Sequence, residues 1–197
     1  MPEPVWLAMI RGGMNAYIAA RQFGIESDFD KKPVWCAERF GQSVTFLPNG
    51  RIVLIAGEHE DSYDSDFCIY NDVFVREIDG TIRIFGYPKS IFPPTDFHTA
   101  TLVGEGIYII GNLGYHDERQ IGTTPVYRLD TNSMRIDKIE TKGECPGWIW
   151  KHRAQLTANG EILIQRGKIF NAPGAEDTEL TSRHILDLST REWRLAP

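Results

Sequence analysis

Three short stretches with one pattern decide the fold of this chain: NGRIVLIAG (49–57), GEGIYIIGN (104–112) and NGEILIQRG (159–167). In each stretch a tight turn leads into a mostly apolar run, which ends at a pair that contains glycine. The last residues lie at 57, 112 and 167, so two successive intervals of 55 residues separate them. A constant spacing of this length indicates an internal structural repeat.

Each stretch forms part of a longer unit with four strand-like runs. A first run precedes the turn at 43–47, 99–103 and 153–157, and the turn residues tolerate the positive φ angles of a tight hairpin. After a longer connection comes a second pair of runs, at 72–78 with 81–85, at 126–130 with 134–139, and at 183–187 with 192–195. Four antiparallel strands in about 45 to 55 residues are the unit expected of a propeller blade.

The repeats resemble those of kelch-type β-propellers, including the central domain of galactose oxidase. The kelch pattern has H-x-A near the first strand, a Gly pair after the second, a Tyr in the third and a D-x-x-[ST]-x-x-W turn before the fourth. Matching residues here are His98-Thr99-Ala100, Gly111, Tyr127 and Asp187 to Trp193. The resemblance covers roughly residues 40 to 197 and implies a propeller fold, most often used for protein recognition.

The chain departs from the kelch pattern in several places. The Gly pair is replaced by Ala56-Gly57, Gly111-Asn112 and Arg166-Gly167, and the blade tryptophan occurs only as Trp193. Gln42 stands at the approximate place of His98 and His152. Because the kelch motif is structural, it predicts the fold more directly than it predicts a function.

We therefore expect an all-β, propeller-like array of three four-stranded antiparallel blades, at about residues 41–88, 96–141 and 150–197. Residues 1–40 do not follow the repeat and form an N-terminal helical or capping segment with a linker. Helix formers and apolar residues at helical spacing predict a short helix over 14–23, with Gly24 as its C-terminal stop.

Three blades leave two sheet faces and two strand edges uncovered, whereas propellers normally close with four to eight blades. Two arrangements solve this problem. Two chains could assemble head to tail as a homodimer with a six-bladed ring, or the N-terminal segment could cap a half-propeller.

The bulk composition is that of a single soluble domain. The chain has 197 residues, 42% hydrophobic and 24% charged, with a net charge of −6. This charge argues against nucleic-acid and membrane-surface partners, which need clustered Lys and Arg. Three cysteines without a C-x-x-C pair and an N-terminus without a signal-peptide pattern favour a cytoplasmic location.

The longer connections of all three repeats are expected on one face of the array, where binding usually resides. From these connections we predict a binding surface whose members are mostly acidic, aromatic or imidazole side chains. They are His59, Asp61, Asp64, Asp66, Asp96, His98, Tyr115, His116, Arg119, Trp148, Trp150 and His152. Two alternatives stay open: Trp148 and Trp150 could pack at a blade interface, and His98 and His152 could make structural hydrogen bonds near the inner strands.

The acidic stretch EHEDSYDSD (58–66) is the first of these connections. It lacks the D-x-[DN]-x-[DN]-G spacing of a calcium loop, and His59 is its only imidazole. We expect a solvated acidic loop without a metal, and no cofactor is implied anywhere in the chain.

The residues contain no nucleophile elbow, phosphate loop or dinucleotide fingerprint in the right context. We therefore expect a binding module for a protein partner or a small polar ligand, with no catalysis implied. The alternative is a small enzyme acting on a sugar or polar metabolite at the propeller centre. That alternative requires inward polar residues such as Arg119, His98 and His152 to converge in one pocket.

Overall fold

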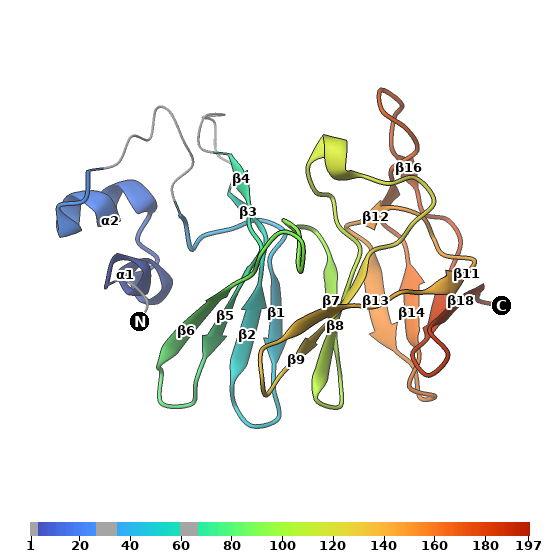
Figure 1. Ribbon diagram of the computed structural model, residues 1–197, viewed down its shortest axis with the longest axis horizontal. Coiled ribbons are helices and arrows are strands. Elements are labelled where there is room, and N and C mark those ends of the chain that lie inside the picture. Colours follow the sequence, from blue (N-terminus) through green and yellow to red (C-terminus); the bar gives the residue numbers. More distant parts are fainter. Residues whose placement is uncertain (1–3, 27–34, 60–66) are drawn as a thin grey trace.

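The computed structural model describes residues 4–26, 35–59 and 67–197, and it shows a mostly β protein with two short N-terminal helices (Figure 1). The predicted β-rich chain with a helical N-terminal segment is confirmed at this level. Within the described ranges, no helix has both the length and the apolar character needed to cross a bilayer.

The two helices are α1 (Pro4–Gly12) and α2 (Ala16–Phe23). Asn15 caps the start of α2, because its side-chain oxygen accepts a hydrogen bond from the Ile18 N–H at 2.9 Å. Gly24 ends this helix in the left-handed conformation with φ 64°. The expected helix at 14–23 is therefore present as α2, whereas α1 lies in an apolar run that was not predicted to be helical.

Each of the three repeats forms an antiparallel meander of four strands. Their members are β1 (Ser43–Phe46), β2 (Ile52–Ile55), β5 (Asp72–Arg76) and β6 (Ile82–Gly86) in the first sheet; β7 (Thr99–Val103), β8 (Gly106–Ile110), β9 (Val126–Asp130) and β10 (Ile136–Lys138) in the second; and β13 (Arg153–Leu156), β14 (Ile162–Gln165), β17 (His184–Asp187) and β18 (Glu192–Leu195) in the third.

Shorter elements occupy the connections between these strands. They are β3 (Glu58–His59) with β4 (Cys68–Ile69), the 3-10 helix η2 (His116–Glu118), β11 (Lys142–Gly143), β12 (Ile149–Trp150), β15 (Lys168–Ile169) and β16 (Thr178–Glu179). β11 adds to β18 in parallel, so the third sheet has five strands in the order β11-β18-β17-β14-β13.

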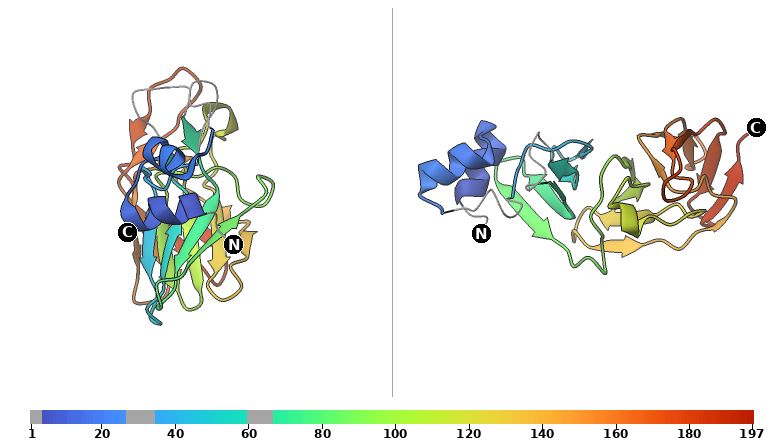
Figure 2. Two further views of the ribbon diagram at one scale, coloured as in Figure 1. Left: turned by 90° about the vertical axis from the view of Figure 1, so that its left-hand side faces the viewer. Right: turned by 90° about the horizontal axis from the view of Figure 1, so that it is seen from above.

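The two ends of the strands differ in character (Figure 1). The tight hairpin turns point downward in this view, while the β3–β4 hairpin, η2 and β16 all lie at the top. Seen from above, the sheets follow one another in a curved row from the helices to the C-terminus (Figure 2). The long connections therefore share one face, as the repeat pattern predicts. We call this upper end the loop face.

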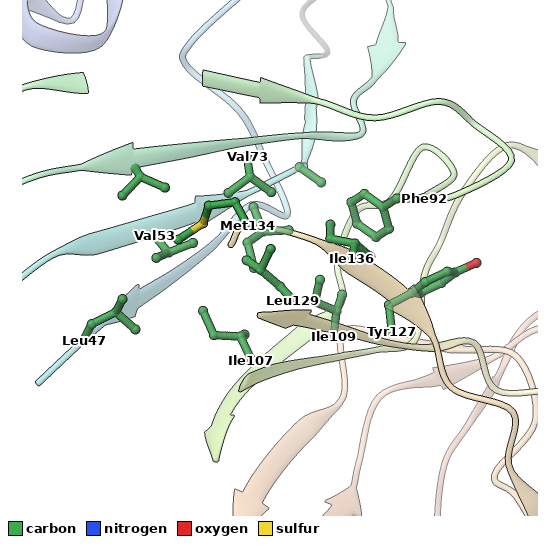
Figure 3. Packing of buried hydrophobic residues seen from close by; sticks show 13 residues of the cluster. Leu47, Val53, Val73, Phe92, Ile107, Ile109, Tyr127, Leu129, Met134 and Ile136 are labelled. Atoms are coloured by element: carbon green, nitrogen blue, oxygen red, sulfur yellow. The ribbon is translucent and has the colours of Figure 1, made fainter. Parts of the chain in front are cut away.

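Two apolar clusters fill the spaces between adjacent sheets. Between the first and second sheets, Val53 and Val73 pack with Ile107, Ile109 and their neighbours, all buried (Figure 3). A second cluster, which includes Ile110, Ile164 and Trp193, joins the second and third sheets. The second sheet is thus apolar on both faces, as a sheet between two neighbours must be.

A repeated backbone bend precedes the first strand of each sheet. Gly41, Phe97 and Lys151 adopt φ angles of 62°, 47° and 51°. The Phe97 N–H donates to the Gly41 carbonyl at 3.0 Å, and the Lys151 N–H donates to the Phe97 carbonyl at 2.9 Å. These bonds connect the bends in series, so the strained conformation of two non-glycine residues is held by contacts between sheets.

The segment before the first sheet covers the outward face of that sheet. The Arg39 side chain is fully buried, forms an ion pair with Asp72, and lies 3.5 Å from the ring centroid of Tyr70. Trp35 donates to Asp72 at 2.9 Å and packs against Phe74 with ring centroids 5.3 Å apart. Because Trp6 of α1 stacks on Trp35 at 4.9 Å, this cluster attaches the helices to the sheet.

We expect Asp72→Asn to lower the free energy of unfolding by about 3 to 5 kcal/mol, because it leaves the buried Arg39 guanidinium without its counter-charge. Urea denaturation followed by tryptophan fluorescence measures the loss. The double variant Arg39→Met with Asp72→Leu should lose clearly less. Equal stability of Asp72→Asn and wild type would contradict this role for the pair.

Candidate binding face

The long connections of the three repeats are tied to one another by side-chain contacts at the loop face. The first tie joins the second connection to the first. The Tyr115 hydroxyl accepts a hydrogen bond from the Ile69 N–H at 3.0 Å, and the Tyr115 ring meets Phe67 edge-on at 5.9 Å. Burial raises the pKa of Tyr115, so its hydroxyl stays neutral.

The second tie joins the second connection to the third. Arg119 donates to the carbonyls of Leu113 at 2.9 Å and Gly114 at 3.2 Å, which fixes its guanidinium. The same guanidinium lies 5.4 Å from the Phe170 ring centroid, and the exposed His116 ring meets Phe170 edge-on at 6.0 Å. Two predicted residues, His116 and Arg119, are thus brought together around an aromatic ring from the neighbouring repeat.

A buried carboxyl pair lies beneath these ties. Asp96 has no exposed surface and Glu58 is 5% exposed. One Asp96 oxygen, Oδ1, accepts from the Gly114 N–H at 2.7 Å, whereas Oδ2 has no N–H partner in the described chain. Burial is the largest cause that raises the pKa of Asp96, and the Gly114 N–H and the Glu58 carboxyl group act in the opposite direction.

Two histidines link neighbouring sheets through equivalent hydrogen bonds. His98 Nε2 lies 2.8 Å from Ser43 Oγ of β1, and His152 Nε2 lies 2.8 Å from Thr99 Oγ1 of β7. Both rings are buried, and neither Nδ1 atom has a hydrogen-bond partner in the described chain. Burial lowers the pKa of His98 to about 4 and that of His152 to about 3, so both rings are neutral at pH 7.

The two predicted tryptophans lie at the contact between the second and third repeats. Trp148 is buried, and its Nε1–H donates to the Leu113 carbonyl at 3.2 Å. Trp150 meets Phe97 edge-on at 6.1 Å, and the Lys151 ammonium lies 5.0 Å from its ring centroid. Both rings therefore pack against the preceding repeat, and Trp150 remains partly exposed.

The remaining predicted residues come from the first connection. His59 lies on β3, opposite Cys68 of β4. Asp61, Asp64 and Asp66 lie outside the described residues. Across residues 4–26, 35–59 and 67–197, no group of three His, Cys, Asp or Glu side chains could hold a metal ion.

Comparison with known proteins adds no assignment to this geometry. No protein-family model and no curated protein sequence matches the chain. Function is therefore inferred from the residues of the loop face themselves.

Several residues of this face were not predicted from the sequence. Glu58 begins the acidic stretch but gave no sign of burial, and its partner Asp96 lies 38 positions further along the chain. Phe170 follows the third repeated stretch in an ordinary polar connection. Lys89, whose ammonium lies 5.8 Å from the Tyr115 ring centroid, comes from the connection between the first two sheets. A pattern confined to one connection cannot reveal contacts between connections.

Acid should destabilise the fold through the two linking histidines. An unfolded histidine binds a proton near pH 6.5, whereas these rings stay neutral until about pH 4 and 3 in the folded chain. The stability that depends on their neutral form is present above pH 6.5 and is lost as the pH falls toward 4, at about 1.4 kcal/mol per pH unit for each ring. Urea denaturation between pH 7 and 4 measures this slope.

The matched variant is His98→Gln with His152→Gln, which places at both positions the residue that the first repeat carries as Gln42. Its stability should fall less steeply over the same pH range. Parallel pH profiles of wild type and variant would contradict the assignment.

Proposed function

We propose that the chain is a three-bladed, kelch-type half-propeller that acts as a binding module and contacts a protein partner through the loop face. The resemblance of the repeats supports the propeller, together with three meanders of equal topology arranged in sequence order. The curved row of sheets agrees with this interpretation (Figure 2).

The observation that carries the proposed binding role is the set of ties between connections from different repeats. Tyr115 fixes the second connection to the first, and Arg119 fixes it beside Phe170 of the third. A surface ordered in advance loses less conformational entropy when a partner binds. The exposed side chains on this ordered surface include His116, Asp117 and Glu176.

The catalytic alternative has less support. It requires Arg119, His98 and His152 to converge in one pocket, but the two imidazoles bond to Ser43 and Thr99, while Arg119 extends over Phe170. None of the three lines the cavities of about 580 and 460 Å³ that lie beside Tyr127 and Tyr108. A binding module remains the proposal that these positions favour.

The two ends of the row favour a capped monomer over a six-bladed homodimer. The helices and the Arg39 cluster cover part of the outward face of the first sheet. The outward face of the third sheet carries exposed Arg153 and Gln155, and an ion pair of 2.7 Å between Arg194 and Glu161. Terminal units with a polar outer face are typical of repeat arrays that end rather than continue.

The positions of the linking histidines also distinguish the interior of the row from its two ends. Each contact between neighbouring sheets has a histidine opposite a Ser or Thr hydroxyl. At the ends of the row, Gln42 replaces the histidine and Arg153 replaces the hydroxyl. Contacts inside the row are therefore alike, and the ends differ from them.

Partner binding should depend on the loop face. We expect the triple variant His116→Ala, Asp117→Ala and Glu176→Ala to lose partners that wild type retains in affinity purification from the source cells, with binding of each isolated partner weakened by about tenfold or more. The reason is that these side chains are exposed on the tied connections of two repeats. Binding of each recovered partner is then measured by calorimetry.

The control changes the opposite end of the strands, at the exposed turn residues Ile78 and Glu105. The variant Ile78→Ala with Glu105→Ala should keep the wild-type partners. If the loop-face variant retains every partner at wild-type affinity, the proposed surface is wrong.

In solution we expect a monomer of 22.4 kDa, measured by light scattering coupled to size-exclusion chromatography at micromolar concentration. Val44 and Phe46 on β1 are 52% and 72% exposed, and a second copy closing a ring would cover them. A particle of twice the monomer mass that Phe46→Ser converts to a monomer would support the six-bladed homodimer instead.

A further inference from the structure

The space between the second and third sheets is filled less completely than the space between the first and second. Between the first pair, Val75 of β5 and Met134 of the β9–β10 turn belong to one apolar cluster. Val75 has no exposed surface and Met134 is 3% exposed. Between the second pair, a cavity of about 460 Å³ lies beside Tyr108 and Leu186. The residues at equivalent positions of the repeats explain this difference.

The first of these positions lies on the third strand of each sheet. Val75 is paired with Val53 of β2 in the first sheet, and Arg128 is paired with Tyr108 of β8 in the second. Arg128 therefore takes the place of a buried valine. Because its side chain faces the third sheet, it lines the cavity.

The second position lies at the end of the turn before the fourth strand. The turns 130–134 and 187–191 both begin with an Asp whose carboxylate accepts from the N–H three residues later, and both end at a φ of 57°. Met134 ends the first of these turns and packs in the apolar cluster (Figure 3). Arg191 ends the second and lines the cavity. Arginines thus replace apolar side chains on both walls.

Neither arginine has a full complement of partners. The Arg128 Nη1 atom lies 3.6 Å from Asp130 Oδ2, which is beyond hydrogen-bond distance. The Arg191 side chain forms no ion pair or hydrogen bond with another described residue. The remaining charged residues of the lining are already paired, each at 2.8 Å: Lys138 with Glu140, and Asp137 with Arg135. Two guanidinium groups of like charge therefore face one cavity.

The rest of the lining is apolar or aromatic. Tyr108 and Ile139 come from the second sheet, and Leu186 and Leu188 come from the third. Leu186 belongs to the cluster that joins these sheets, and the other three pack against it. The volume of about 460 Å³ is within the range of roughly 300 to 1,000 Å³ that is typical of small-molecule pockets.

We propose that this cavity binds a small organic phosphate monoester, with its phosphate group between Arg128 and Arg191 and its apolar or aromatic body against Tyr108 and Leu186. A phosphate monoester carries a charge of about −1.5 to −2 at pH 7, so one group neutralises both guanidinium groups, whereas a carboxylate neutralises only one. The planar guanidinium fork also matches the spacing of phosphate oxygens. The site lies between two sheets and does not rest on the proposed use of the loop face.

The test measures the binding of three probes by calorimetry at pH 7: phenyl phosphate, inorganic phosphate and benzoate. The variants Arg128→Met and Arg191→Met each remove one guanidinium and keep an unbranched apolar stem. Arg191→Met also restores the residue that the first interface carries as Met134. The matched control Arg153→Met removes the same charge from an exposed position of β13 that does not line the cavity.

We expect phenyl phosphate to bind wild type at least about tenfold more tightly than inorganic phosphate or benzoate does. Arg128→Met and Arg191→Met should each weaken its binding by about tenfold or more, the loss of charge-assisted hydrogen bonds, while Arg153→Met stays within about twofold of wild type. In thermal unfolding without a probe, Arg191→Met should melt no lower than wild type, because it removes a like charge and adds apolar contact. An arginine with a purely structural role would lower the melting temperature when replaced.

Failure of both phosphate probes to bind at millimolar concentration would overturn the proposal, and so would equal affinity of wild type and the two cavity variants for phenyl phosphate. Benzoate binding as tightly as phenyl phosphate would contradict the choice of a dianion. Inorganic phosphate binding as tightly would contradict the role of the apolar walls. The loop-face triple variant should bind phenyl phosphate as wild type does, so the two proposed sites succeed or fail separately.

Discussion

The need to bury apolar sheet faces governs this molecule. A single four-stranded meander with two apolar faces cannot stand alone in water, so each sheet depends on its neighbours for cover. Between the first and second sheets, Val53 and Ile107 reach complete burial only because two repeats supply opposite sides of one cluster. The series of bends at Gly41, Phe97 and Lys151, and the two linking histidines, set the distance at which these faces meet.

The same requirement explains why the ends of the row differ from its middle. At one end, the Arg39–Asp72 ion pair and the rings around it replace the apolar face that a further sheet would present. At the other end, Arg153 and Arg194 make the outer surface polar. A buried ion pair costs much desolvation energy, so the pair adds little net stability over apolar side chains of the same volume.

The sequence predicts the repeated part of the structure well because its signals are local. The spacing of 55 residues, the hairpin turns and the apolar runs each depend on neighbours in the chain, and the three meanders follow them closely. The end of α2 at Gly24 is local in the same sense. By contrast, α1 lies in the apolar run Val5 to Ile10, whose helical conformation depends on packing against residues such as Tyr70.

The candidate sites were harder to predict from the sequence because they form between repeats. The structural hydrogen bonds considered for His98 and His152 are present, but each partner hydroxyl lies more than 50 positions away and could not be identified from the sequence. In a repeat protein the core follows from what the repeats share, whereas binding surfaces follow from how individual connections depart from the pattern. The second sheet shows such a departure in its long connection, which contacts both neighbouring repeats through Tyr115 and Arg119.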